Sequence, residues 1–156
     1  SRAQPDKLGM WAHSNGGQIA LSVLEVVDKN IPTVLWAPVS KPFPYSILYY
    51  TDEYDDNGKY LRSIISQFET QYDVEQFSLT NYLDWIQSPL QVHQGGVDED
   101  VLLAWSDELY EKLSILEKDV EYFTYPNADH NLVPDWNKAA TSSLTFFDQN
   151  VRDRFP

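Results

Sequence analysis

The chain has 156 residues, enough for one domain with a buried core of its own. Its 11 basic and 24 acidic residues give a formal net charge of −13, which argues against nucleic acid or an anionic membrane as a partner. The chain has no cysteine, so disulfides, thiolate catalysis and cysteine-based zinc sites are excluded. No run approaches the roughly 20 apolar residues that a membrane span requires. Three histidines without paired ligand spacing predict neither a metal nor another cofactor.

The first part of the chain predicts two short strands with a helix between them. Residues 7–12 form an apolar run, and apolar residues then recur at three- and four-residue spacing over 16–29, as they do along one face of a helix. A second apolar run, 33–37, stops at Pro38, because proline cannot continue a central strand.

The segment 41–85 breaks this alternation, and we interpret it as an insertion over the sheet. Prolines, clustered tyrosines and an acidic run predict an exposed loop over 41–58, whereas apolar residues at helical spacing predict a helix over 60–68. The rest of the segment contains no clear strand.

The last part of the chain returns to alternating strands and helices. It predicts a strand over 89–93, a helix over 102–116, a strand over 120–125 and a closing helix over 136–151. The predicted order is therefore β-α-β-insertion-β-α-β-α. This order is typical of an α/β fold with a mostly parallel sheet and helices on its faces.

A serine between the first strand and its helix carries the strongest chemical signal. It lies in the run Ala12-His13-Ser14-Asn15-Gly16-Gly17, where small residues surround it as a tight strand-to-helix turn requires. Such a turn projects the hydroxyl of Ser14 beyond the sheet, while the next backbone N–H points at a developing oxyanion. The pattern has Ala12 where glycine is usual. An ordinary junction with an incidental serine is the alternative.

An acid and a histidine follow the third and fourth predicted strands. Because the carboxyl ends of parallel strands meet at one edge of a sheet, Asp98 and His130 are expected near Ser14. A histidine can take the proton of a serine hydroxyl, and a carboxylate fixes the imidazole tautomer and supports its positive charge. Glu99 and Asp100, beside Asp98, are alternative acids.

Three segments in this order resemble the α/β-hydrolases, and within them the prolyl-oligopeptidase-like and dienelactone-hydrolase-like branch. They are the run 12–17, the acid segment 88–101 and the histidine segment 125–132. The resemblance covers most of the chain outside 41–85 and implies an α/β-hydrolase catalytic domain over 1–156.

What the resemblance implies is a serine hydrolase that cleaves an ester or peptide bond through an acyl-enzyme, either a carboxylesterase or a prolyl-oligopeptidase-like peptidase. Ser14 would be the nucleophile, and His130 the general base and then the acid. Asp98 would orient the histidine, and the family spacing favours it over its acidic neighbours. Asn15 would supply one oxyanion-hole N–H.

Members of the resembled family carry about four further strands before the elbow, and a loop among them supplies a second oxyanion donor. We therefore expect this chain to be the C-terminal portion of the domain, with a preceding half or another chain completing the sheet. The rival hypothesis is a non-catalytic binding or assembly module that keeps the fold but lacks a complete oxyanion hole.

Other polar residues near these segments have structural interpretations. His13 is expected to pack under the elbow, and His93 to be a buried histidine with satisfied hydrogen bonds. Asp129, next to His130, is expected to be structural or to face the substrate. The acidic run 52–58 lacks the alternating ligand spacing of an EF-hand loop and is interpreted as a solvated loop.

Aromatic residues gather where the second strand runs into the insertion. This cluster could line an acyl or aryl pocket, as aromatic side chains often do: Trp36, Phe43, Tyr45, Tyr49, Tyr50 and Tyr54. Its first three members, Trp36, Phe43 and Tyr45, are the candidate substrate-binding residues. The same rings could instead form a small core within the insertion, and the sequence leaves both interpretations open.

Overall fold

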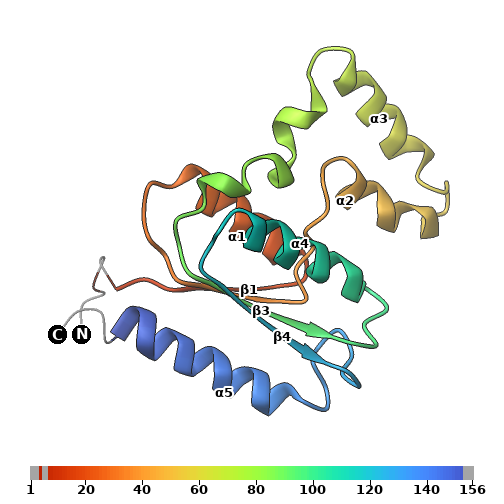
Figure 1. The fold of residues 1–156 in the computed structure, drawn as a ribbon. Helices are drawn as coiled ribbons and strands as arrows, with labels where there is room; N and C mark the ends of the chain where they lie inside the picture. Colours follow the sequence, from red (N-terminus) through yellow and green to blue (C-terminus); the bar gives the residue numbers. More distant parts are fainter. Residues whose placement is uncertain (1–3, 5–6, 153–156) are drawn as a thin grey trace.

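The computed structural model describes residue 4 and residues 7–152, and it contains a parallel sheet with helices on both faces (Figure 1). The strands β1 (Met10–His13), β2 (Thr33–Trp36), β3 (Leu90–Gly95) and β4 (Val120–Tyr125) lie in the spatial order β1-β2-β3-β4. Each neighbouring pair is parallel, so all their carboxyl ends lie at one edge. The predicted α/β fold with a parallel sheet is confirmed.

The central strands β2 and β3 are buried along their whole length, whereas the outer strands β1 and β4 are partly exposed. Helices on both faces explain this difference, because a central strand then has no side that faces water. Successive residues of β2 alternate between two cores. Leu35 packs on one face, and Val34 and Trp36 pack on the other.

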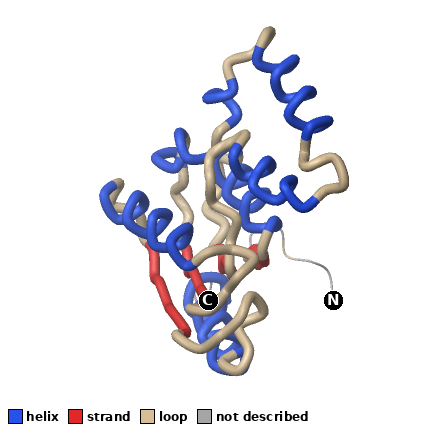
Figure 2. Tube along the Cα trace, turned by 90° about the vertical axis from the view of Figure 1, so that its right-hand side faces the viewer, coloured by secondary structure: helices blue, strands red, loops and turns tan. Residues whose placement is uncertain are grey.

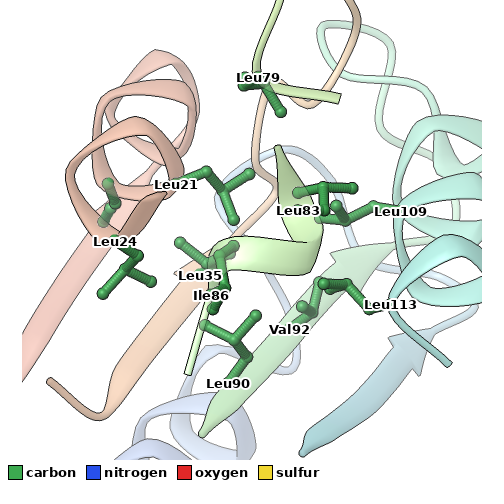
Figure 3. Close-up of a cluster of buried hydrophobic side chains, with 12 residues drawn as sticks. Leu21, Leu24, Leu35, Leu79, Leu83, Ile86, Leu90, Val92, Leu109 and Leu113 are labelled. Carbon is green, nitrogen blue, oxygen red and sulfur yellow. The ribbon is translucent and has the colours of Figure 1, made fainter. Parts of the chain in front are cut away.

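The helices α1 (Asn15–Val26) and α4 (Leu103–Ile115) cover one face of the sheet, and α5 (Trp136–Phe147) covers the other (Figure 1). A π-helical turn, Asp148–Arg152, follows α5. Figure 3 shows leucines of α1 and α4 pointing toward Leu35, Leu90 and Val92 of the strands. Each fully buried leucine contributes about 1.5–3 kcal/mol. This face therefore holds the site's scaffold together.

The segment 41–85 contains no strand, as predicted. It holds α2 (Tyr45–Leu48), α3 (Lys59–Glu69) and short 3-10 turns at Tyr49–Glu53, Val74–Phe77, Leu79–Asn81 and Leu83–Trp85. Its part around α3 stands away from the sheet (Figure 1, Figure 2), whereas Leu79 and Leu83 near its end are buried in the core beside the strands (Figure 3). The helix expected over 60–68 is confirmed by α3. The prediction of a loop over 41–58 was wrong for residues 45–53, which form helical turns. Tyrosine rings of this stretch pack on Trp105 of α4 and hold the stretch in that conformation.

In the part of the chain that the structure describes, no helix is both long and apolar enough to cross a membrane.

Candidate active site

Ser14 occupies a tight turn between β1 and α1. Its φ of 57° and ψ of −125° lie in a region that residues other than glycine rarely adopt. A conformation of this kind costs about 1–3 kcal/mol, and it persists only where the surroundings enforce it. Here the Ser14 N–H donates to Trp36 O at 2.9 Å, and the Val39 N–H donates to Ser14 O at 3.0 Å. The Ser14 hydroxyl has no hydrogen-bond partner among the described residues, so it is available to a ligand.

Asn15 follows Ser14 as the first residue of α1. The first backbone N–H groups of a helix have no partner within the helix, and the helix dipole adds partial positive charge there. Asn15 thus has a backbone N–H without a partner inside the helix, and it lines the same cavity as Ser14.

Asp98 and His130 form a hydrogen-bonded pair at the ends of β3 and β4. Asp98 Oδ2 lies 2.9 Å from His130 Nδ1, and the Asp98 side chain is fully shielded from solvent. Because a carboxylate accepts the hydrogen bond, the proton sits on Nδ1 and leaves Nε2 of His130 free to take a proton. Of the three neighbouring acids, Asp98 is the one that holds this bond. Glu99 and Asp100 are exposed.

The Asp98 carboxylate is held on both oxygens. Oδ1 accepts from the backbone N–H groups of Asp100 at 2.9 Å and Val101 at 2.8 Å. Oδ2 accepts from the side-chain amide of Gln94 at 2.9 Å, in addition to its bond with His130. Four donors therefore fix the orientation of this side chain.

Gln94 was not identified from the sequence. It is fully buried near the end of β3, and it accepts a hydrogen bond from Ser106 Oγ at 2.8 Å, which fixes its amide with the NH₂ group toward Asp98. A polar residue at the end of a buried strand was the available signal, because a buried amide requires partners.

The loop that carries His130 packs closely on the end of β3. A Cβ atom on Gly95 would lie 2.3 Å from Asp129 O and 2.4 Å from Ala128 O, so only glycine allows this approach. The Val97 N–H donates to Ala128 O at 3.1 Å and ties the acid segment to the histidine loop.

Two neighbours of the pair have supporting roles. Asp129 Oδ1 accepts from the N–H groups of Asn131 and Val133, both at 2.9 Å, which agrees with the structural alternative for this residue. His13 Nε2 lies 3.0 Å from His130 O, and the two rings are 4.6 Å apart. His13 therefore contacts the loop that carries His130.

Ser14 and His130 line one cavity of about 480 Å³. This volume is within the range of small-ligand sites. The other lining residues come from the start of α1, the end of β2, the segment 41–85 and the acid segment: Asn15, Val39, Ser46, Ile47, Tyr50, Tyr54 and Asp100.

The three aromatic candidates lie outside the lining of this cavity. Trp36 faces α5, where its Nε1 donates to Ser143 Oγ at 3.0 Å. Phe43 packs on Phe68 and Phe77 in a small aromatic core within 41–85. Tyr45 packs on Tyr49 and Trp105. Two other members of the predicted aromatic cluster, Tyr50 and Tyr54, line the cavity with Ser14.

His93 is a buried structural histidine, as predicted. Its Nδ1 lies 2.9 Å from the Tyr125 hydroxyl and its Nε2 lies 2.8 Å from Gln91 Oε1. Burial lowers the pKa of His93 to about 4, so the ring is neutral at physiological pH.

Within the described residues, one group could offer three ligand atoms to a metal: Asp98, Asp100 and His130, whose donor atoms lie within 4.8 Å of one another. A cation there would have to displace the bonds that already fix Asp98. The acidic run 52–58 has other contacts, because Asp56 accepts from the N–H groups of Gly58 and Tyr60 and Asp52 pairs with Arg62.

Comparison with known proteins gives one family. Residues 1–154 match the model of the prolyl oligopeptidase family. No curated protein sequence matches the chain significantly.

Solved structures share the fold at low sequence identity. A puromycin-hydrolyzing peptidase of Mycobacterium tuberculosis superposes with a TM-score of 0.74 at 22% identity, over 96% of this chain and 22% of that chain. An acylaminoacyl peptidase of Pyrococcus horikoshii superposes with a TM-score of 0.71 at 17% identity, over 96% of this chain and 24% of that chain. A variant of SOBER1 from Arabidopsis thaliana superposes with a TM-score of 0.60 at 16% identity, over 95% of this chain and 55% of that chain. The chain thus spans about a quarter of the length of these two peptidases.

Proposed function

Because this chain belongs to the prolyl oligopeptidase family, we propose that it acts as a serine hydrolase through Ser14, His130 and Asp98. The observation that carries the proposal is the arrangement around one cavity. The strained turn presents an unpartnered Ser14 hydroxyl to the space that His130 also lines, and Asp98 holds that histidine at 2.9 Å.

In the proposed reaction, Nε2 of His130 takes the hydroxyl proton as Ser14 Oγ attacks the substrate carbonyl carbon. The new bond makes a tetrahedral intermediate whose negative oxygen accepts from the Asn15 N–H. His130 then gives the proton to the leaving group, and the acyl group stays on Ser14. Water, activated by the same imidazole, releases the acid and restores the serine. In the present structure Ser14 and His130 share no hydrogen bond, and contacts of this kind often close only with substrate bound.

The bond cleaved is proposed to be an ester or a peptide bond. The chemistry of the three residues serves both, because an acyl-enzyme forms from either. The names of the two peptidases of similar fold favour an amide. Removing one oxyanion donor typically lowers kcat by about 10²–10³. We therefore propose that a second donor, from outside the described residues, accompanies the Asn15 N–H in the active form.

The edge of β1 supports a partner strand at this position. In the described part of the chain, β1 pairs with β2 alone, and an apolar groove of about 480 Å³ lies beside it, lined by Trp11, Trp36 and Trp136 among others. The same groove is the observation that favours the second candidate function, a non-catalytic assembly module. In that case the protein would bind a partner along β1, and Ser14 would remain unreactive.

Hydrolysis of p-nitrophenyl acetate by the full polypeptide that contains this sequence tests the proposal. We expect Ser14→Ala to lower kcat by at least about 10³, as loss of a nucleophile does. Ser22→Ala, which truncates an exposed serine on the same helix, is the matched control and should retain the activity. Equal rates for Ser14→Ala and the parent protein would remove the proposed mechanism.

A further inference from the structure

The cavity beside Ser14 contains one acidic side chain, that of Asp100. Apart from His130, it is the one residue of acidic or basic type among those that line the space. Its carboxylate lies close to the reacting groups, because donor atoms of Asp98, Asp100 and His130 are all within 4.8 Å of one another. A charge at this position acts directly on whatever occupies the cavity.

No described residue neutralises the charge of Asp100. Its carboxylate has neither an ion pair nor a hydrogen bond among the described residues, in contrast to Asp98, which accepts four hydrogen bonds. The chain as a whole has a net charge of −13, so its overall field does not compensate this carboxylate either. The cavity therefore offers an unpaired negative charge to a ligand.

The backbone of Asp100 is fixed. Its N–H donates to Asp98 Oδ1 at 2.9 Å, and its carbonyl accepts from the Tyr50 hydroxyl at 3.0 Å. Burial, chiefly, raises the pKa of Tyr50 to about 12, so the phenol stays protonated and donates this bond throughout the physiological range. The backbone of Asp100 is thus anchored to Asp98 on one side and to Tyr50 in the cavity wall on the other, and the carboxylate itself is bonded to no described residue.

Resting on the proposed function, we propose that Asp100 makes this cavity select substrates that carry a positive charge next to the scissile bond. The rings of Tyr50 and Tyr54 line the same space, and the faces of aromatic rings attract cations. The charge on the substrate could be the side-chain ammonium of a lysine or the free α-ammonium of an N-terminal residue. Both present the same group to a carboxylate.

Three p-nitrophenyl esters separate these sources: those of Nα-acetyl-norleucine, Nα-acetyl-lysine and free norleucine. The first is neutral, the second has a charge on the side chain, and the third has it on the α-amine. We expect kcat/KM for one charged ester to exceed that for the neutral ester by roughly tenfold, since a hydrogen bond to a charged group contributes about 1.5–3 kcal/mol and every 1.4 kcal/mol is tenfold. The favoured ester identifies the source of the charge.

Asp100→Asn should reduce this ratio of kcat/KM values to near one, because the amide keeps the shape but not the charge. Glu99→Gln removes an exposed charge next to it, outside the cavity lining, and should leave the ratio as in the parent protein. High salt should lower the ratio in the parent, because the carboxylate is exposed to solvent.

The proposal is overturned if the parent protein shows no preference for either charged ester, or if Asp100→Asn keeps the preference. An equal loss for all three esters would also overturn it, since Asp100 would then act through His130 rather than on the substrate. Failure of the serine mechanism is recognised separately, because Ser14→Ala would then still hydrolyse the neutral ester.

Discussion

The Gln94 side-chain amide donates to Asp98 Oδ2 at 2.9 Å, the same carboxylate oxygen that bonds His130. Gln94 is fully buried, and Ser106 fixes its orientation. The amide therefore sets the direction of the carboxylate that in turn orients the imidazole. Gln94 is a positioning residue in the proposed mechanism.

Gln94→Leu should lower kcat/KM by about 10- to 100-fold, because a hydrogen bond to a charged group contributes about 1.5–3 kcal/mol. Without the amide donor, the Asp98 carboxylate stabilises the charged form of the His130 imidazole more strongly. The acidic limb of the pH profile of kcat/KM should therefore move to higher pH. A pH series on p-nitrophenyl acetate measures both effects.

Ser106→Ala is a second variant that tests the same role with a milder change. It removes the bond that orients the amide but keeps the amide itself, so its loss should have the same sign and be smaller. A Gln94→Leu protein with the parent's kcat/KM and pH profile would contradict the assigned role.

The two glycines after Ser14 should respond differently to alanine. A Cβ atom on Gly17 would lie 2.4 Å from Pro38 Cβ and 2.8 Å from Pro38 Cα, whereas one on Gly16 would meet only Ala12 Cβ, at 3.7 Å. Both glycines lie in α1, where alanine is favoured over glycine by about 0.5–1 kcal/mol.

Gly16→Ala should therefore keep or slightly raise the melting temperature, and Gly17→Ala should lower it, because a backbone shift at Pro38 disturbs the turn that holds Ser14. Thermal unfolding followed by circular dichroism distinguishes them. Equal melting temperatures for the two variants would show that the contact with Pro38 is not tight.

Glu25 on α1 should make stability depend on pH. Burial, and next the nearby charge of Asp84, raise the pKa of Glu25 from 4.5 to about 8, and Glu25 Oε1 is buried without a hydrogen-bond partner. The folded protein then binds more protons than the unfolded chain between these values. The pH-dependent contribution of Glu25 to the stability of the folded protein is fully present below pH 4.5 and is lost as pH rises through 8.

Glu25→Gln removes this titration. The melting temperature of the variant, compared with that of the parent, should rise progressively from pH 5 to about pH 8. Glu111→Gln, at an exposed position on α4, is the control and should show a difference that does not vary in this way. A constant offset between Glu25→Gln and the parent would contradict the shifted pKa.

The parallel sheet could be predicted because short strand-like segments alternate along the chain with apolar residues at helical spacing, as in β-α-β units. The juxtaposition of Ser14, Asp98 and His130 followed from the same inference, since strand ends of a parallel sheet share one edge. The choice of Asp98 among three adjacent acids came from resemblance. Spacing alone does not say which carboxylate turns toward the imidazole.

The substrate-facing rings could not be predicted in the same way. Trp36 lies on the face of β2 that packs on α5, which the two-residue period of the strand indicates once Leu35 is placed under α1. The positions of Phe43, Tyr50 and Tyr54 depend instead on how 41–85 folds on α4. Its turns are set by contacts far apart in the sequence, which local patterns do not contain.

Covalent labelling of Ser14 tests the account most directly. The full polypeptide, treated with a fluorophosphonate and digested, should carry the phosphonyl group on the peptide that contains Ser14, and Asp98→Asn should slow the labelling strongly. A protein that hydrolyses esters while this peptide stays unmodified, or one whose adduct lies on another serine, would contradict the assignment of Ser14 as the nucleophile.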